Sequence, residues 1–364
     1  FPDPLGSMQA LHIHAGPRAL AHLREHGLGP ADIRLIPAAA GGPKGLILNH
    51  LDQDIFGRWL PQAPATHQVH LVGASIGAWR MATAMMPDPA AQFERLAREY
   101  IAQNYPVEPG HSRPTAQAVS DGFAQSMQDF FGASLPGMLQ HPNWHLHVIT
   151  SRGRGILRAP GRWGSMAGFA GLALSNAISR DQVGRWLQRT VFSSDQALPL
   201  TLTDQPTTQV VLTPDNFMKV VQASCSIPFW LDPVRDIAGS PPGTHWDGGL
   251  VDYHFHWPYD QMSQGLVLYP HFQRQVIPGW LDKAFKRRHR PTPWLDNLIV
   301  LTPNPEWVRT LPNGKLPDRK DFTARTFEQR QQEWTRAVAE SERLSVEWQT
   351  WLEAGCPTDR VQPL

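Results

Sequence analysis

Residues 69–77 read VHLVGASIG, and this stretch decides the expected fold of the chain. Its first four residues predict a short strand, which runs directly into the pattern G-x-S-x-G. A serine with a glycine on each side suits a sharp turn from a strand into a helix, because the glycines relieve crowding of the backbone. Residues 78–86 continue with helical character. The stretch therefore predicts a strand–turn–helix unit with the Ser75 hydroxyl exposed at a helix N-terminus, where developing negative charge is favoured.

The same order of elements occurs once before this stretch. Residues 33–39 predict a strand, residues 40–45 (AGGPKG) form a glycine-rich turn, and residues 46–60 have the periodicity of an amphipathic helix. Two such units in succession are typical of a right-handed parallel α/β fold.

Elements of both kinds are expected in the rest of the chain. Residues 18–26 predict a helix, and residues 87–143 are helical with loops. Further strands are expected at 145–150, 266–269 and 298–301, and further helices at 163–178, 217–224 and 322–354. The last of these would be one long helix that contains Trp334, Trp348 and Trp351 and ends at Gly355.

Composition narrows the class of protein. The 364 residues carry 33 Lys and Arg against 32 Asp and Glu, and this formal net charge of +1 argues against a nucleic-acid-binding protein. The two cysteines, Cys225 and Cys356, cannot build a disulfide framework, which favours a reducing compartment. No apolar run is long enough to cross a bilayer. We therefore expect a cytoplasmic protein that would touch a membrane only at its surface.

The glycine-rich turn at residues 40–45 is a candidate anion site. The N–H groups of Gly41 and Gly42 can approach a tetrahedral oxyanion without an intervening side chain, whereas Pro43 has no N–H. A glycine-rich connection without a ligand is the simpler interpretation. A phosphate-binding P-loop is excluded, because Lys44 is followed by Gly45 and not by Ser or Thr.

A candidate carboxylate comes from Asp247–Gly248–Gly249. Asp-Gly is among the commonest turn dipeptides, so the triplet alone indicates only a turn. Together with Ser75 and the double glycine, Asp247 can supply the base that a serine nucleophile needs.

Taken together, these motifs resemble the patatin-like phospholipase family. Four segments occur in the family's order between about residues 33 and 253: Gly41–Gly42–Pro43–Lys44–Gly45, Gly73–Ala74–Ser75–Ile76–Gly77, Ala223–Ser224–Cys225–Ser226–Ile227–Pro228 and Asp247–Gly248–Gly249. One position departs from the family's pattern, because Ala40 stands where the loop usually has a third glycine. If that position needs a positive φ, alanine is disfavoured there.

The resemblance implies a three-layer α/β/α sandwich with a mostly parallel central sheet and a Ser–Asp catalytic dyad. Asp247 would accept the Ser75 proton as Oγ attacks an ester carbonyl, while Gly41 and Gly42 hold the oxyanion. The residues that support these motifs would be Lys44, Gly45, Gly73, Gly77, Gly248 and Gly249. The implied substrate is a lipid or another hydrophobic acyl ester, cleaved as by a phospholipase A, a lysophospholipase or an esterase, with no cofactor and no metal.

We divide the chain accordingly into three parts. Residues 1–7 (FPDPLGS) precede Met8 and read as a vector-derived remnant. Residues 8–275 would form the catalytic α/β domain, and residues 276–364 a C-terminal helical extension or lid packed on the same domain.

Histidines leave two alternatives open. His254 and His256 follow Asp247 closely, so a conventional Ser–His–Asp hydrolase is a competing hypothesis. Three H-x-H pairs, at 12/14, 145/147 and 254/256, could instead indicate a metal site, but no third ligand stands at a defined spacing. A further alternative is a catalytically inactive lipid-binding scaffold of the same fold, to which only Ala40 points.

Two segments place basic residues beside apolar ones, as helices at a membrane surface require. Arg152, Arg154, Arg158 and Arg162 precede the apolar residues 163–178, and the basic residues of 283–290 follow Trp280–Leu281. The simpler interpretations are a buried small-residue helix for the first segment and a solvated charge run for the second. The sequence indicates no oligomeric state.

Overall fold

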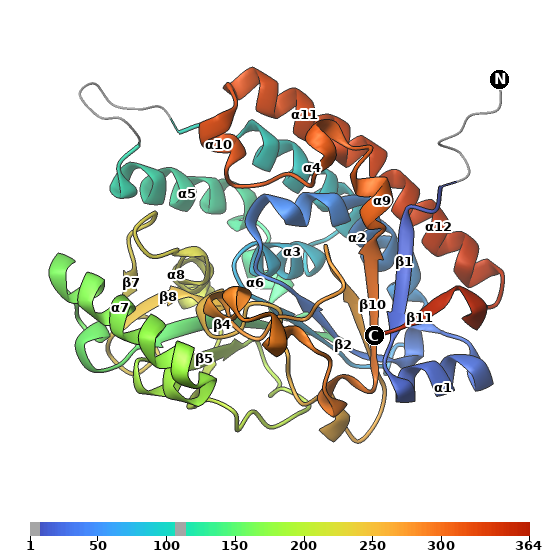
Figure 1. Ribbon diagram of the computed structural model, residues 1–364, viewed down its shortest axis with the longest axis horizontal. Helices are drawn as coiled ribbons and strands as arrows, with labels where there is room; N and C mark the ends of the chain where they lie inside the picture. Colours follow the sequence, from blue (N-terminus) through green and yellow to red (C-terminus); the bar gives the residue numbers. More distant parts are fainter. Residues whose placement is uncertain (1–7, 106–113) are drawn as a thin grey trace.

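The computed structural model describes residues 8–105 and 114–364, apart from the side chain of Arg162. The expected vector remnant, residues 1–7, lies outside these residues. In the described part of the chain, one mixed sheet of 11 strands has the order β11-β1-β10-β9-β2-β3-β4-β5-β6, with β8 paired to β4 and β7 to β8 (Figure 1). The strands are β1 (Leu11–Ala15), β2 (Ile33–Ala38), β3 (Val69–Gly73), β4 (Trp144–Gly153), β5 (Leu187–Ser193), β6 (Thr207–Val211), β7 (Val234–Arg235), β8 (Thr244–Asp247), β9 (Leu266–Pro270), β10 (Leu298–Pro303) and β11 (Val361–Pro363).

The centre of the sheet is parallel. Strands β10, β9, β2, β3 and β4 pair in parallel, whereas β1 joins β10, and β5 and β8 join β4, in antiparallel fashion. Every residue of β3, β9 and β10 is buried, as expected for strands that are covered on both faces. The predicted α/β class with a mostly parallel sheet is confirmed.

Helices cover the sheet on both sides. They are α1 (Pro17–His26), α2 (Asn49–Asp54), α3 (Ile76–Ala84), α4 (Pro89–Ala102), α5 (Ala116–Phe131), α6 (Leu135–Met138), α7 (Arg162–Ile178), α8 (Pro214–Cys225), α9 (Pro305–Val308), α10 (Asp321–Ala324), α11 (Phe327–Glu340) and α12 (Glu342–Glu353). Helices α2, α3, α4, α11 and α12 contact one another on one side, and α7 lies with the turns of residues 280–284 on the other (Figure 1). This arrangement is the three-layer α/β/α sandwich.

Two helices that were predicted to be continuous are interrupted in the structure. Residues 46–60 form a run of 3-10, α and π turns instead of one α-helix. The expected helix over 322–354 is divided into α10, α11 and α12. Thr326 and Gln329 form a reciprocal capping box that starts α11. The buried Ser341 ends it, because its hydroxyl donates back to the Val338 carbonyl (2.6 Å).

The C-terminal residues belong to the sheet as well as to the helices. β10 lies between β1 and β9, and β11 lies beside β1. Residues 276–364 are therefore more than a helical extension or lid, because they supply one inner strand and one edge strand. The boundary between residues 275 and 276 stays a prediction.

Among the described residues, the buried apolar side chains form one main cluster and two smaller ones. The main apolar cluster includes Trp348 and Trp351, which are fully buried. A smaller cluster, which includes Leu157, Leu172 and Trp246, lies beneath α7. The tryptophans of the C-terminal helices are thus part of the core.

Candidate active site

The pairing of β4 brings two strand ends together. β3 pairs with the first part of β4, where Gly73 lies opposite Val148. β8 pairs antiparallel with the later part, where Asp247 lies opposite Thr150. Because β5 occupies the other edge of β4, β3 and β8 share one edge and end facing each other. Ser75 follows β3 by two residues, which brings it level with Asp247.

Ser75 occupies the turn between β3 and α3. Its φ of 56° and ψ of −128° are strained for a residue other than glycine, and such strain is concentrated at functional sites. The Ser75 amide donates to Ser224 Oγ (3.0 Å), and the Ser224 hydroxyl donates to the Ile149 carbonyl (2.7 Å). Ser224 at the end of α8 therefore ties the strained turn to β4.

Asp247 is buried beside Ser75 and is in no ion pair among the described residues. One carboxylate oxygen accepts a hydrogen bond from the Gly249 amide (2.7 Å). Burial raises the pKa of Asp247 to about 6, although the Gly249 amide, the Ser75 hydroxyl and the charge of Arg319 oppose the shift. The site thus holds a carboxylate that is more basic than an ordinary aspartate.

The three predicted motifs approach each other closely. A Cβ built on Gly77 would lie 1.8 Å from the Ala38 carbonyl oxygen at the end of β2, and one built on Gly249 would lie 2.6 Å from Ala40 Cβ. Only glycine fits at these two positions. The turn of Ser75 and the turn of Asp247 therefore both pack against the start of the glycine-rich loop.

The glycine-rich loop leaves the amides of its two successive glycines unused. Within residues 8–105 and 114–364, the amides of Gly41 and Gly42 donate no hydrogen bond to the protein. Ala40 does not have a positive φ, and its amide donates to the Tyr253 carbonyl (3.0 Å). Position 40 therefore does not require a glycine for its φ, and alanine fits the backbone there.

Comparisons with known proteins add little to this geometry. No protein-family model and no curated protein matches the chain. Among solved structures, the chain is similar to VipD from Legionella pneumophila, with 12% sequence identity and a TM-score of 0.26. The match covers 76% of this chain and 56% of VipD. A likeness this weak carries no argument, so the function of the site has to be argued from its own residues.

The histidines that follow Asp247 are engaged elsewhere. His254 Nδ1 lies 3.1 Å from the Gln275 carbonyl oxygen, and His256 bridges the Val276 carbonyl (2.9 Å) and the Thr292 hydroxyl (2.8 Å). In the described part of the chain, neither ring has a hydrogen bond to Ser75 or Asp247. No group of three or more His, Cys, Asp or Glu side chains among the described residues is arranged to hold a metal ion.

Three neighbours of the pair were not expected to act in the site. The sequence predicts no role for Ser224 or Cys225 beyond their place in the segment 223–228, yet the Cys225 thiol lies buried beside Ser75 and Asp247. Burial, followed by the charge of Asp247, raises the pKa of that thiol. Arg319 was not singled out at all, because it belongs to no motif. Its guanidinium lies 3.3 Å from where a Cβ on Gly42 would be.

A cleft of about 570 Å³ opens between α4 and α5. Trp79, Tyr100, Tyr105 and Leu96 are among the side chains that line it. Trp79 lies on α3 one turn after Ser75, and its amide donates to the Ser75 carbonyl (3.4 Å). An aromatic cleft therefore begins one helical turn from the candidate nucleophile.

The loop after Asp247 is anchored by a buried ion pair. Asp252 accepts two hydrogen bonds from Arg189 (2.6 and 2.7 Å) and one from Trp257 (2.8 Å). Arg189 also pairs with Asp204 (2.9 Å). Burial lowers the pKa of Arg189, but the two carboxylates outweigh burial and hold it above its ordinary value.

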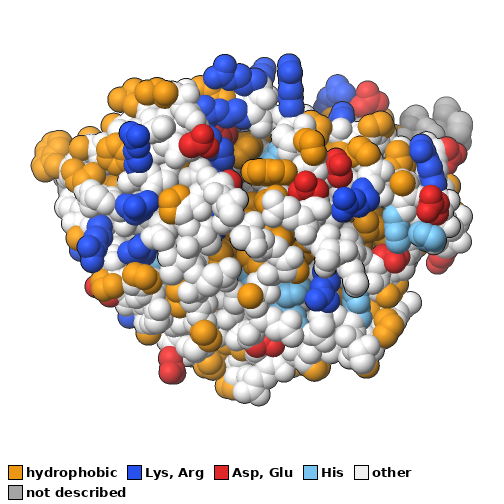
Figure 2. All heavy atoms as spheres, turned by 90° about the horizontal axis from the view of Figure 1, so that it is seen from below, with side chains coloured by type: hydrophobic (Ala, Val, Ile, Leu, Met, Phe, Trp, Pro, Cys, Tyr) orange, Lys and Arg blue, Asp and Glu red, His pale blue; other side chains and the backbone are white. Residues whose placement is uncertain are grey.

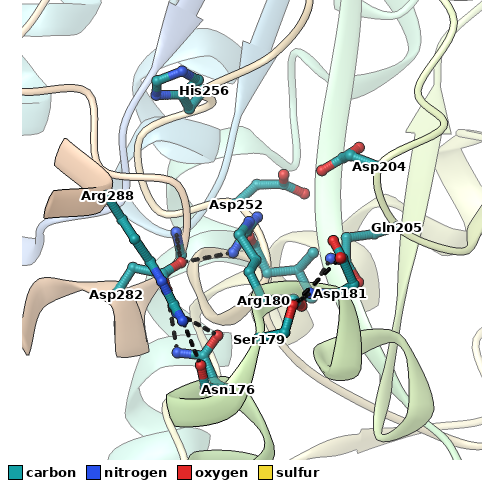
Figure 3. Close-up of polar contacts among 12 residues, drawn as sticks. Asn176, Ser179, Arg180, Asp181, Asp204, Gln205, Asp252, His256, Asp282 and Arg288 are labelled. Atoms are coloured by element: carbon teal, nitrogen blue, oxygen red, sulfur yellow. Dashed lines mark hydrogen bonds and ion pairs between the residues drawn. The ribbon is translucent and has the colours of Figure 1, made fainter. Parts of the chain in front are cut away.

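A second anchor joins this loop to α7 (Figure 3). The Asp282 carboxylate lies between the guanidinium groups of Arg180 (2.8 Å) and Arg288 (2.6 Å). Arg180 also donates to the Val251 carbonyl (2.7 Å), and Arg288 to the Asn176 carbonyl (2.8 Å). The basic segment 283–290 is therefore not a simple solvated charge run, because Arg288 is committed to this anchor.

Helix α7 exposes an apolar stripe. Trp163, Leu174 and Ile178 are 77%, 71% and 82% exposed, and they lie on one face at helical spacing. The interpretation of this segment as a buried helix is wrong for that face. Figure 2, in which α7 stays on the left, shows hydrophobic side chains along this edge with Lys and Arg beside them. Among the described residues, no helix has the length and hydropathy needed to cross a membrane.

Proposed function

We propose that this chain is a patatin-like serine hydrolase that cleaves carboxylic esters of lipids or of other hydrophobic acyl compounds. The observation that carries the proposal is the buried pair of a hydroxyl and a carboxylate: Ser75 on its strained turn, beside Asp247 with a pKa of about 6. Such a carboxylate is ionised at neutral pH and is a stronger base than an ordinary aspartate. It is therefore suited to take a proton from a serine.

In the proposed reaction, Asp247 accepts the hydroxyl proton as Ser75 Oγ attacks the ester carbonyl. The tetrahedral intermediate expels the alcohol, which takes the proton back from Asp247 and leaves an acyl group on Ser75. Water then attacks this acyl group and gives a proton to Asp247. When the second intermediate breaks down, Ser75 regains a proton and the carboxylic acid leaves.

The oxyanion of both intermediates would be held by backbone amides. Those of Gly41 and Gly42 are candidates because they have no acceptor among the described residues. The amide of Ile76, the first residue of α3, is a third candidate, since the residue after a nucleophile often provides a donor. The N-terminus of α3 adds positive potential at the same place.

The surroundings of the pair support a hydrophobic substrate. The aromatic cleft beside Trp79 offers space for an acyl chain. The exposed stripe of α7, with the exposed Arg154 and Arg158 preceding the helix, is suited to lie on a lipid surface. Both features support the proposal that the substrate is a lipid ester.

Labelling with a fluorescent fluorophosphonate tests the proposal directly. The wild-type chain is expected to be labelled and to hydrolyse p-nitrophenyl butyrate and octanoate, whereas Ser75→Ala is expected to do neither. Ser165→Ala on α7 is a matched control and is expected to behave as the wild type. A folded wild-type chain that neither reacts nor hydrolyses any ester would favour the inactive lipid-binding scaffold.

The conventional triad can be tested with the same assay. Asp247→Asn is expected to abolish turnover, and His254→Ala and His256→Ala are expected to retain it in the molecules that remain folded. If Asp247→Asn were harmless and either histidine variant inactive while folded by circular dichroism, a Ser–His–Asp mechanism would replace the dyad.

A further inference from the structure

Three cations surround the glycine-rich loop next to the proposed dyad. The Arg319 guanidinium lies at Gly42, 3.3 Å from a Cβ built there. Lys44 Nζ lies 5.5 Å from the centre of the Phe272 ring, and this ring closes on Gly41, 2.5 Å from a Cβ built on that glycine. Arg319 and Lys44 therefore place positive charge next to the loop.

The third cation approaches through Tyr253. Lys283 Nζ lies 5.1 Å from the centre of the Tyr253 ring. The carbonyl of Tyr253 accepts the Ala40 amide (3.0 Å), and the Tyr253 ring borders Gly249, with an atom 3.5 Å from a Cβ built there. Lys283 therefore lies against a tyrosine that contacts both the loop and the turn that carries Asp247.

These cations have no partner in the part of the chain that the structure describes. The side chains of Arg319, Lys44 and Lys283 make no hydrogen bond or ion pair with residues 8–105 or 114–364. Arg80, by contrast, is buried and is paired with Asp52 (2.7 and 2.8 Å). Lys44 and Arg319 are half-buried and Lys283 is exposed, so the charges of all three are available to an anionic ligand.

The acidic groups nearby do not cancel the positive charge. Asp318 acts on Lys283, but one of its oxygens already accepts the Lys320 amide (3.0 Å). Partial burial of Lys283, followed by the charges of Lys44 and Arg319, lowers the pKa of Lys283 in spite of Asp318. The part of this shift that comes from Lys44 and Arg319 indicates that like charges lie near Lys283. An anion placed among them would relieve that repulsion.

The positive charge continues into a cleft of about 520 Å³. Its lining includes Lys283, Lys286, Arg290 and Arg274, and no Asp or Glu side chain of the described residues lines it. Lys283 belongs to both the cleft and the surroundings of the loop. The net charge of the whole chain is only +1, so this tract is a local concentration of positive charge.

We propose that the ester cleaved at Ser75 carries an anionic group, phosphate or carboxylate, that is recognised by Arg319 together with Lys44 and Lys283. This inference rests on the proposed hydrolase function and names its substrate class. Arg319 would be the main contact, since a guanidinium binds either oxyanion through two parallel hydrogen bonds. The two lysines and the cleft beyond them would attract the anion at longer range.

Four matched esters separate the possibilities: dihexanoylglycerol, its phosphate, its hemisuccinate and dihexanoylphosphocholine, each used below its micellar concentration. We expect kcat/KM for the phosphate or the hemisuccinate to exceed that for dihexanoylglycerol by about ten-fold or more, because a charge-assisted hydrogen bond is gained. Which of the two is preferred identifies the anion. Equal kcat/KM values for charged and neutral esters would overturn the inference.

The variant Arg319→Gln tests whether Arg319 is responsible for the preference for an anionic ester. It is expected to lower kcat/KM for the preferred anionic ester by about ten-fold more than kcat/KM for dihexanoylglycerol. Arg319→Lys should recover part of the loss, and Lys283→Gln should give a smaller loss that added salt also produces. Equal losses for neutral and anionic esters would mean that Arg319 acts on the oxyanion of every substrate, which contradicts recognition. Arg309→Gln, at an exposed ion pair, is the matched control.

Binding without turnover keeps the two proposals apart. The Ser75→Ala chain, titrated calorimetrically with the same esters, is expected to bind the preferred anionic ester at least about ten-fold more tightly than the neutral one. Failure of the hydrolase proposal would appear as absent labelling of the wild type, and it would leave this binding preference intact. Absence of the preference in a folded Ser75→Ala chain would overturn the inference even if neutral esters were hydrolysed.

Discussion

Asp247 and Asp252 are five residues apart at the end of one strand, and both are buried, yet their surroundings differ completely. Asp252 is held by two hydrogen bonds from Arg189 and one from Trp257. Asp247 has one backbone amide and the Ser75 hydroxyl, and no ion pair among the described residues. The protein thus neutralises one buried carboxylate and leaves its neighbour without a cation partner.

The difference indicates two separate roles. A buried carboxylate that is paired with a guanidinium cannot easily gain a proton, because the ion pair would be broken. A buried carboxylate without such a partner destabilises the fold, but it can accept a proton at neutral pH. The loop from 247 to 252 therefore joins a reactive group to an anchor that holds it in place.

The largest expected contrast is in activity. Asp247→Asn removes the proposed base and is expected to lower kcat/KM by at least about a thousand-fold, as loss of a catalytic group usually does. Asp252→Asn removes a group that touches neither Ser75 nor substrate, so folded molecules should keep kcat/KM within about ten-fold. Ester hydrolysis, normalised to the fraction folded by circular dichroism, checks both. Equal losses would remove the distinction between base and anchor.

The next contrast is in the stability of the anchor. Asp252→Asn leaves Arg189 buried with only Asp204 as a charged partner, and the free energy of unfolding is expected to fall by about 3 to 5 kcal/mol. Urea denaturation measures this change. Glu306→Gln, which breaks the exposed pair with Arg309 (3.5 Å), is a suitable control and should change stability by less than about 1 kcal/mol.

The corresponding substitution at Asp247 is expected to raise the free energy of unfolding instead of lowering it. Its pKa is about 6 in the folded chain against an ordinary 3.8, so its stabilising contribution is present below pH 4 and is lost as the pH rises through 6. Asp247→Asn cannot ionise, and at pH 7 it should therefore be more stable than the wild type by about 2 to 3 kcal/mol. Unfolding measured at pH 4 and pH 7 tests this, because the advantage should be absent at pH 4.

The smallest effect is expected at the support of the nucleophile. Ser224→Ala leaves the Ser75 amide and the Ile149 carbonyl without their shared partner, which is expected to cost about 1 to 2 kcal/mol of stability. Because the turn of Ser75 is strained, we also expect kcat to fall by about ten-fold through misplacement of Oγ. Ser226→Ala is the control, since the Ser226 hydroxyl only donates back to the Gln222 carbonyl (2.9 Å). A kcat unchanged in Ser224→Ala would show that the strained turn needs no such support.

Local sequence was enough for the parts of the site that depend on one turn. The strand, sharp turn and helix around Ser75 follow from residues 69–86, because crowding at such a turn demands glycine nearby. The same holds for the glycine-rich turn after β2. The role of Arg319 could not be predicted, because it depends on a loop that returns to Gly42 from more than 270 residues away in the sequence.

Elements defined by distant pairing were missed for the same reason. Thr244–Asp247 is too short to show a strand period, and it becomes β8 only because β4 extends beyond the end of β3. The long helix expected at 322–354 failed for a different reason. Thr326 and Ser341 interrupt its apolar spacing, because their side chains compete for backbone groups.

The short strand β11 covers β1 and so protects the outer edge of the sheet from pairing with other molecules. Val361–Pro363 runs beside β1, and the Leu364 amide adds a bond to the Ala15 carbonyl (3.1 Å). Without these four residues, β1 would present a row of open amides and carbonyls, and such a row readily recruits strands from other molecules. A chain clipped after Arg360 is therefore expected to self-associate through β1 while its fold is still intact.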